Sequence, residues 1–207
     1  MKEIIPGTVV TSRVRLARNL SGYAFPNRMD NESSKKAAAE IKNALMTNYG
    51  EELTVTDINS SNEKSTLVEE HIISPDFSQD SPLCRLLITD ENGNLSVMVN
   101  EEDHVRIQAL YPGFMLEEAF TLANKADDAI AKGCKIAFDE EKGFLTSCPT
   151  NLGTGLRVSV MLHLPALGAF GYIKNTIAML NKIGLTVRGI YGEGSDAQGN
   201  LYQLSNE

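Results

Sequence analysis

The sequence predicts an α+β fold in which a mainly antiparallel β-sheet is flanked by helices. Two hairpin signals, at residues 85–100 and 135–146, place a short polar turn between two strand-like runs. Two or three long segments with apolar residues at helical spacing accompany these hairpins. A doubly wound parallel sheet fits less well, because regular alternation of strands and helices is missing. We therefore expect helices packed on one face of an antiparallel sheet.

Local signals predict the individual elements. In chain order they are an irregular or extended segment (1–29), a helix (31–49), loops (56–66 and 74–82), a hairpin (85–89 with 95–100), a helix (114–132), a second hairpin (135–138 with 143–146), a strand (156–164), a helix (170–182) and two late strands (186–191 and 200–204) joined by a turn (192–199).

Capping residues predict the helix ends. Residues 31–34 (NESS) offer N-caps for the first helix. Gly133 is expected to close the second helix as a left-handed cap, and Gly184 to end the third. The first helix has apolar residues at helical spacing, namely Ala37, Ile41, Ala44 and Leu45.

Composition excludes several classes of protein. The 207 residues, 42% hydrophobic and 22% charged, are enough for one substantial globular domain. A net charge of -8 argues against nucleic-acid binding, because phosphate backbones favour basic proteins. No apolar run is long enough for a membrane span or a signal peptide. Three widely spaced cysteines without a CxxC pair indicate a reduced, cytoplasmic protein without a zinc site.

The arginines are the most informative residue type. There are eight, and five of them lie in four short segments: 11–15, 100–106, 153–157 and 187–189. An arginine side chain holds a planar fork of donors that binds phosphate or carboxylate bidentately. Several forks from distant parts of an acidic chain therefore predict a cage for a polyanion such as a nucleoside triphosphate.

The segment 100–106 (NEEDHVR) predicts acid–base chemistry. If it continues the preceding strand, Glu102, His104 and Arg106 share one face, as the strand period of two requires. A carboxylate beside an arginine could then act as a base next to a bound phosphate. The alternative is a solvated acidic turn.

Three further segments have both a functional and an ordinary interpretation. Residues 148–157 (CPTNLGTGLR) could cradle an anion with free amides or simply form a tight turn, and Cys148 could be a reactive thiol or a small buried hydrophobe. Glu193 is an isolated carboxylate in a glycine-rich turn, or a solvated loop residue. His71 by itself reads as a strand histidine without a special role.

Taken together, SRVR, EEH-ISP, NEEDHVR, CPTNLGTGLR and VRGIYGE, in this order, resemble the catalytic domain of the ATP:guanido phosphotransferases. This family includes creatine and arginine kinases and the bacterial protein-arginine kinases. The resemblance runs from about Val10 to Asn206, and LARN, IQALYPG and SVMLHLPAL look most like the protein-arginine kinase branch. It implies the α+β fold of the guanido kinase and glutamine synthetase-like catalytic domains.

The resemblance also implies a set of site residues. Glu102 corresponds to the family's catalytic base, Glu193 to a second carboxylate, and Cys148 to the reactive cysteine near the guanidinium. Magnesium would arrive bound to the nucleotide. The implied ATP site comprises Thr11, Ser12, Arg13, Val14, Arg15, His71, Arg106, Arg157, Val158, Ser159, Val160, Met161, Arg188, Gly189, Ile190, Tyr191, Gly192 and Glu193.

The function implied is transfer of the γ-phosphoryl group of ATP to arginine residues of protein substrates. Regulatory partners in bacterial stress response and proteolysis follow from the same resemblance. Two alternatives stay open: a kinase for free arginine or another small guanidino compound, and a nucleotide-binding regulatory module without turnover. The chain is expected to be a single catalytic domain, 1–207, without the family's C-terminal helices and C-terminal domain, so homodimerisation is left open.

Overall fold

The computed structural model describes residues 7–189 and 198–206. Its contacts divide the chain into two compact units. The first unit comprises residues 1–14, 110–120 and 157–207, and the second comprises residues 15–109 and 121–156.

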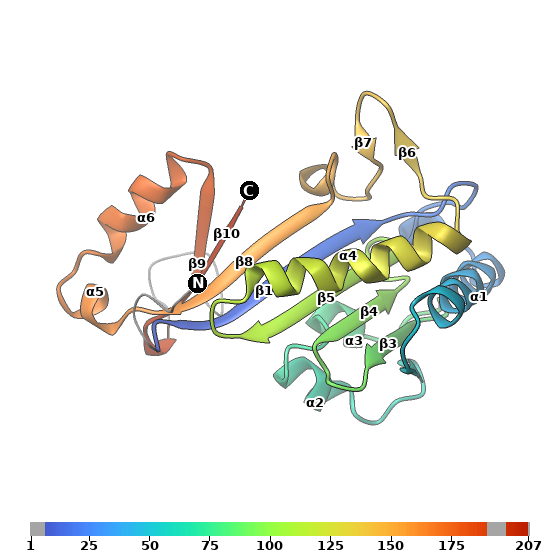
Figure 1. The fold of residues 1–207 in the computed structure, drawn as a ribbon, viewed down its shortest axis with the longest axis horizontal. Coiled ribbons are helices and arrows are strands. Elements are labelled where there is room, and N and C mark those ends of the chain that lie inside the picture. Colours follow the sequence, from blue (N-terminus) through green and yellow to red (C-terminus); the bar gives the residue numbers. More distant parts are fainter. Residues whose placement is uncertain (1–6, 190–197, 207) are drawn as a thin grey trace. The chain divides into compact units, whose positions relative to one another are not determined.

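Within the described residues, hydrogen-bonded neighbours form an eight-stranded sheet of order β2-β3-β4-β5-β1-β8-β10-β9 and a separate hairpin, β6-β7 (Figure 1). The strands are β1 (Val9–Arg18), β2 (Leu53–Asp57), β3 (Leu86–Asp90), β4 (Leu95–Val99), β5 (Val105–Pro112), β6 (Phe138–Asp139), β7 (Gly143–Phe144), β8 (Leu156–His163), β9 (Leu185–Gly189) and β10 (Leu201–Asn206). The helices are α1 (Asn31–Asn48), α2 (Lys64–Glu69), α3 (Pro75–Ser78), α4 (Leu116–Gly133), α5 (Pro165–Ala169) and α6 (Ile173–Asn181). Helices accompany an antiparallel sheet, so the predicted α+β class is confirmed.

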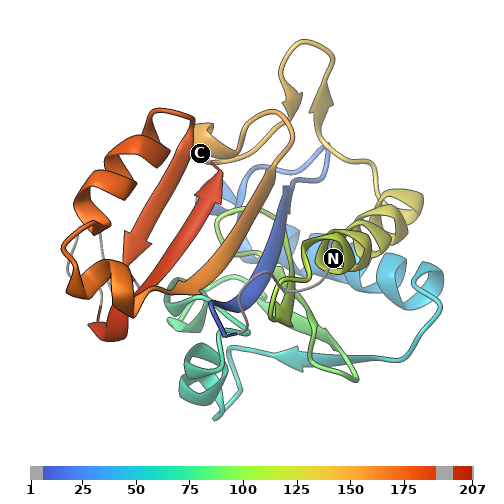
Figure 2. The ribbon, with the colours of Figure 1, turned by 60° about the vertical axis from the view of Figure 1, so that its left-hand side comes forward.

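The second unit has helices on both faces of its strands, which corrects the expectation of one covered face. Leu87 and Met98 are cross-strand partners, and they pack with Phe77 of α3 in one buried cluster. Their strand neighbours Ile88 and Val97 project to the opposite side and are also fully buried. The longer helices α1 and α4 cover that side (Figure 2).

Several short elements were missed because their sequences carry strong loop signals. Residues 56–66 and 74–82 were predicted as loops, but they contain the end of β2, the start of α2 and all of α3. Helix α3 begins at a proline, and the Ser74 side chain accepts a hydrogen bond from the Phe77 amide. Proline and serine therefore act here as a helix start, not as a loop.

The predicted helix at 31–49 is confirmed, with a correction at its N-cap. Asp30, one residue before the predicted caps, accepts a hydrogen bond from the Ser33 amide at 2.8 Å. Its carboxylate also satisfies the Ser33 hydroxyl, so the first turn is held by one side chain. The four predicted apolar positions, Ala37, Ile41, Ala44 and Leu45, are all buried.

Gly133 is not the left-handed cap that the sequence suggested. It is the last residue of α4, and its φ angle is not positive. A Cβ atom at Gly133 would lie 2.6 Å from the Ala44 Cβ of α1 and 3.0 Å from the Ala44 Cα. The glycine is therefore required for the close approach of two helices.

Replacing Gly133 with alanine should destabilise the protein by about 1–3 kcal/mol, the usual cost of overpacking. Helix propensity alone would favour alanine by about 1 kcal/mol, so the two effects have opposite signs. Urea denaturation of Gly133→Ala, of Ala44→Gly and of the double variant measures their coupling. A stabilising Gly133→Ala, or strictly additive effects in the double variant, would contradict the close contact.

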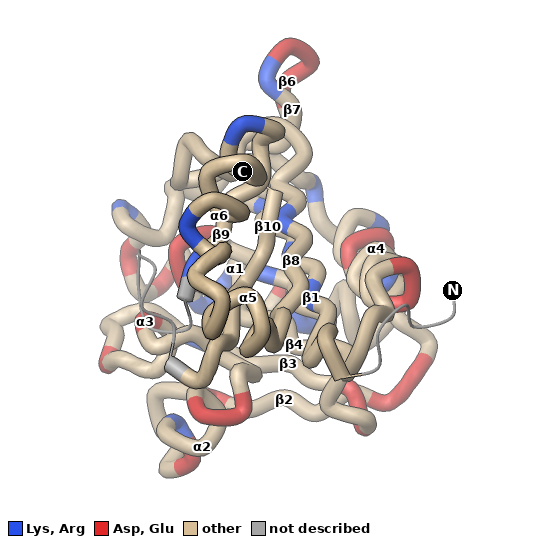
Figure 3. The backbone as a smooth tube through the Cα atoms, turned by 90° about the vertical axis from the view of Figure 1, so that its left-hand side faces the viewer, with Lys and Arg blue, Asp and Glu red and all other residues tan. Residues whose placement is uncertain are grey.

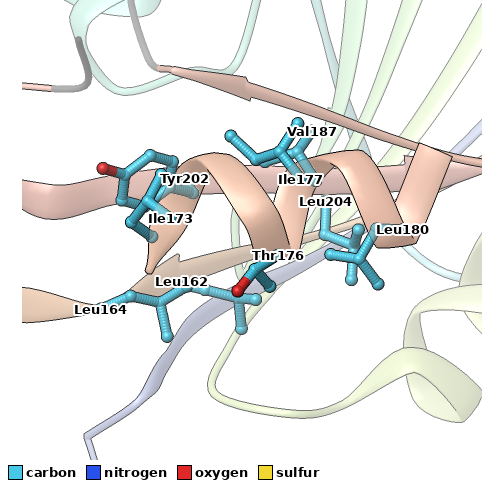
Figure 4. Close-up of a pocket in the computed structure, with 9 residues that line it drawn as sticks. All are labelled: Leu162, Leu164, Ile173, Thr176, Ile177, Leu180, Val187, Tyr202 and Leu204. Atoms are coloured by element: carbon cyan, nitrogen blue, oxygen red, sulfur yellow. The ribbon is translucent and has the colours of Figure 1, made fainter. Parts of the chain in front are cut away.

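In the first unit, α6 covers one face of β8, β10 and β9. The helix predicted at 170–182 begins later than expected, because Gly171 has a φ of 72°, which is not helical, and α6 begins only at Ile173. Leu204 pairs with both Val160 and Val187, and it lies on the covered side. An apolar pocket under the helix is lined by Leu162, Leu164, Ile173, Thr176, Ile177, Leu180, Val187, Tyr202 and Leu204 (Figure 4).

Candidate active site

An acidic turn, defined as Asn100–His104, joins β4 to β5 in the second unit. Asn100 has a φ of 60°, a left-handed conformation that asparagine tolerates better than most residues. Its side-chain amide donates to the carbonyls of Ser34 at 3.0 Å and Cys84 at 2.8 Å. Because Asn100 is fully buried and tied to two distant segments, the turn has a fixed starting point.

Arg106 of β5 forms ion pairs with both glutamates of the acidic turn. Its Nη1 lies 2.6 Å from a carboxylate oxygen of Glu101, and its Nη2 lies 3.0 Å from one of Glu102. The Glu101 side chain is only 4% exposed and also accepts a hydrogen bond from Ser74. The Glu102 side chain is 42% exposed, so it is the glutamate that an incoming substrate can reach.

The surroundings of Glu102 make it a stronger base than an ordinary glutamate. Partial burial raises the pKa of Glu102, and the charge of Arg106 opposes this effect. Nearby Asp103 and Glu101 raise the pKa further. A carboxylate with a raised pKa that still reaches solvent is suited to accept a proton during a reaction.

The segment around His71 lies against the same cluster. The His71 carbonyl accepts a 2.7 Å hydrogen bond from Gln108, which lies two residues beyond Arg106 on β5. His71 has a φ of 60° and an exposed side chain, so it is a turn residue, not the strand histidine of the ordinary interpretation. The structure thus places the backbone of His71 beside β5, the strand that bears Arg106.

Cys148 lies at the start of a short 3-10 turn, Pro149–Asn151, and is partly exposed. Its Sγ is 3.0 Å from the Thr150 hydroxyl. Gly155 serves backbone packing, because a Cβ there would lie 2.6 Å from the Ala17 carbonyl oxygen, and Gly153 adopts a φ of 105° that favours glycine. This geometry supports the tight-turn interpretation of the GTG sequence.

The first unit presents a basic face, defined as Arg13, Arg157 and Arg188 with Gln203 and Ser205 of β10. Gln203 is the cross-strand partner of Arg188 and accepts a 2.8 Å hydrogen bond from Arg13. Arg157 contacts the Ser205 hydroxyl at 3.4 Å. Cross-strand partners project to the same side, so these residues lie opposite the side that α6 covers.

Arginines elsewhere in the second unit have structural roles. Arg18 is buried, pairs with Asp127 at 2.7 Å and stacks 3.6 Å above the ring of Phe144. Arg85 donates to the carbonyls of Asp76 and Phe77 in α3 and of Gln79 just after it, and its guanidinium lies over the Phe77 ring. Basic residues are marked in blue along β1 and β8 in Figure 3, and Arg18 shows that not every one of them belongs to a binding site.

Comparison with known sequences decides the family. Residues 32–207 match the family described as ATP:guanido phosphotransferase, C-terminal catalytic domain. The chain belongs to this family.

The chain is also similar to individual proteins of this family, both in sequence and in structure. Protein-arginine kinases of Syntrophomonas wolfei and Halalkalibacterium halodurans are 49% and 48% identical over 204 residues, covering 96% of this chain and 57% of each relative. The chain thus spans a little over half the length of these relatives. The duplicated taurocyamine kinase of Schistosoma mansoni, solved with bound transition state analog components, aligns with a TM-score of 0.85 and 31% identity over 96% of this chain and 29% of that chain.

Not every residue of the ATP:guanido phosphotransferase motifs faces a possible ligand. Ser12, Val14 and Val160 are buried, and the Ser12 hydroxyl donates to the Gly113 carbonyl and accepts from the Met115 amide. Along β1, the partly exposed residues Thr11, Arg13 and Arg15 alternate with the buried residues Ser12 and Val14. Val158, Ser159 and Met161 belong to β8, and Gly189 ends β9. Ile190, Tyr191, Gly192 and Glu193 lie outside the described residues.

The prediction that Glu102, His104 and Arg106 share one strand face is wrong. His104 does not share a face with Glu102 and Arg106, because residues 101–104 form the turn and β5 begins only at Val105. His104 is fully buried and points to the segment that follows β1. Residues two apart share a face only within a strand, and no local sequence signal marked the end of β4 at Val99.

Sequence reasoning also missed residues that hold the arginines. Glu101 and Ser74 position Arg106, and Gln203 and Ser205 contact arginines of the basic face. Glu101 was visible in the motif, but only its burial distinguishes it from Glu102. Gln203 and Ser205 alternate on one late strand, and they become informative once the register of β10 is known.

Proposed function

We propose that this chain transfers the γ-phosphoryl group of ATP to the guanidinium of arginine residues in proteins. The observation that carries the proposal is the 49% identity to a protein-arginine kinase over 96% of the chain. The pairing of Glu102 with Arg106 supports it, because it places a basic carboxylate beside an arginine of the nucleotide motif. We infer that these 207 residues act as a cytoplasmic catalytic domain with regulatory partners in bacterial stress response and proteolysis. Among the described residues, no helix is long and apolar enough to span a bilayer.

The proposed roles follow from the chemistry of phosphoryl transfer, which needs positioning and charge neutralisation more than covalent help. Arg13, Arg15, Arg106, Arg157 and Arg188 would hold the triphosphate with their donor forks. The acceptor guanidinium has a pKa above about 12 and is a poor nucleophile while it is protonated.

Three residues would act on the acceptor. Glu102 and Glu193 would orient the guanidinium. Glu102 would remove its proton as the nitrogen–phosphorus bond forms and the bond from the γ-phosphorus to the oxygen of the departing ADP breaks. Cys148 would lie near the same group.

The divalent ion is proposed to enter with the nucleotide. Among the described residues, His, Cys, Asp and Glu side chains form no group of three or more that could hold a metal. Mg²⁺ commonly binds through substrate phosphates and keeps several waters, and it would neutralise phosphate charge here.

Two other functions remain as competing hypotheses. A kinase for a small guanidino compound is favoured by the likeness to taurocyamine kinase, although that identity is 31% against 49% for the protein-arginine kinase. A regulatory module that binds nucleotide without turnover retains the same fold. The paired Glu102 and Arg106 favour catalysis over this second alternative.

A turnover assay tests the proposal. The chain is incubated with Mg-ATP and, in parallel, with free arginine or an unfolded arginine-rich protein, and product is scored as acid-labile phosphate and as a mass shift on arginine. We expect label on protein arginine. Label on free arginine alone would assign the small-substrate function. Nucleotide binding without label on either acceptor would favour the regulatory module.

A further inference from the structure

A buried polar network lies beside the acidic turn and is not used by the proposed chemistry. It consists of Asn19, Asp103 and His104, which are 0%, 1% and 0% exposed. These residues come from the segment after β1 and from the end of the acidic turn. All of them belong to the second unit.

One carboxylate oxygen of Asp103 joins two segments that are far apart in the sequence. Asp103 Oδ1 accepts a 2.7 Å hydrogen bond from the Ser147 amide and a 2.6 Å bond from the Asn19 side chain. The same Asn19 amide donates to the Leu145 carbonyl at 3.0 Å. Residues 145–147 are therefore held against the acidic turn by one direct hydrogen bond, from Ser147, and by a bridge of two hydrogen bonds through Asn19.

His104 holds the other side of the network. Its backbone amide donates to Asn19 Oδ1 at 2.9 Å, and its Nδ1 accepts from the Leu20 amide at 3.0 Å. Nε2 must then carry the proton, and it donates to the Ala24 carbonyl at 2.9 Å. Burial lowers the pKa of His104, which keeps the ring neutral in this arrangement.

The network connects two of the three residues proposed to act on the guanidinium, Glu102 and Cys148. Glu102 directly precedes Asp103, and Cys148 directly follows Ser147. Each is thus one residue from an atom of the Asp103–Ser147 hydrogen bond. We propose that Asp103, supported by Asn19, is a positioning residue that fixes the turn bearing Cys148 relative to the turn bearing Glu102.

The choice of a carboxylate is costly for stability alone. Asp103 Oδ2 is buried and has no hydrogen-bond partner among the residues that the structure describes. A buried charged oxygen without a partner is unfavourable, whereas charge-assisted bonds to Oδ1 are stronger than neutral ones. This combination fits a residue that fixes geometry better than one that only fills a core. The kinetic part of this inference rests on the proposed function, while its structural part does not.

The test compares Asp103→Asn and Asp103→Ala with the unchanged chain. Asparagine keeps an acceptor oxygen for the Ser147 amide, whereas alanine removes it. Hydrogen exchange reports opening at Ser147, and iodoacetamide labelling mapped by mass spectrometry reports the reactivity of Cys148. Acceptor kinetics and the Kd of Mg-ATP complete the comparison. Asp30→Ala, which removes the N-cap of α1, is the matched control for general destabilisation.

In Asp103→Ala we expect Ser147 exchange to rise by about tenfold or more, as for loss of one charge-assisted hydrogen bond. Cys148 labelling should change, the acceptor KM should rise or kcat should fall, and the Mg-ATP Kd should stay within about twofold, since the bond touches no nucleotide residue. Asp103→Asn should be intermediate, and Asp30→Ala should leave Cys148 labelling unchanged.

The outcomes separate this inference from the proposed function. Unchanged Ser147 exchange and Cys148 labelling in a folded Asp103→Ala would overturn the inference, even if the chain is an active kinase. Altered exchange with unchanged acceptor kinetics in an active chain would also overturn the positioning role. If Asp103→Ala does not fold, Asp103→Asn decides by the same readouts. If the unchanged chain has no kinase activity, the proposed function fails, and exchange and labelling still test the link.

Discussion

Substituting Glu102 with glutamine is expected to abolish phosphoryl transfer while nucleotide still binds. Glutamine keeps the size of the side chain and can still accept a hydrogen bond from Arg106, but it cannot take up the proton of the guanidinium. Loss of a general base typically lowers the rate by about 10²–10⁴-fold. The measurement is turnover with Mg-ATP and acceptor, together with the ATP Kd from calorimetry.

The matched control is Glu91→Gln, which makes the same change in the exposed turn between β3 and β4. It should leave turnover and the ATP Kd unchanged. Normal turnover in Glu102→Gln would show that Glu102 is not the general base. Loss of turnover together with loss of ATP binding would instead indicate that the Glu102–Arg106 pair mainly organises the nucleotide site.

The parts of the fold that the sequence predicted well are those with local causes. The hairpin of β3 and β4 follows from a polar turn between two apolar runs, and α1 follows from the spacing of its buried residues Ala37, Ile41, Ala44 and Leu45. The short helices α2 and α3 could not be predicted, because too few residues are present for a helical period to show. Their stability comes from Leu67, Val68 and Phe77 packing on β3 and β4, which is a tertiary effect.

In the candidate site, too, residues with local signals were predictable from the sequence and those with long-range contacts were not. The sequence identified Glu102 and Arg106 because they lie close together in one motif, and the structure shows them paired. It could not identify Asp103 as a link, because its partner Ser147 lies 44 residues away. Likewise Gln203 contacts Arg13 across 190 residues of chain, and only strand register makes that contact visible. Long-range hydrogen bonds leave no periodic signal in a single sequence.

Replacing Arg157 with lysine is expected to weaken nucleotide binding sharply. Arg157 lies on β8 within the basic face, where its planar fork reaches the Ser205 hydroxyl at 3.4 Å. A lysine keeps the positive charge but offers a single ammonium group, so it cannot bind phosphate bidentately. Losing one charge-assisted hydrogen bond costs about 1.5–3 kcal/mol, which is roughly ten- to a hundredfold in Kd.

Calorimetry with Mg-ATP measures this change, and Arg28→Lys at an exposed position is the matched control that should bind normally. Equal affinity in Arg157→Lys would show that charge alone suffices there and would argue against a bidentate cage. A loss of affinity would show that donor geometry contributes to nucleotide binding beyond charge, since Arg157→Lys preserves net charge and changes only donor geometry. Acidic composition makes that distinction important: with a net charge of -8, the chain gains little from long-range attraction of a polyanion, so affinity must come from a few well-placed forks.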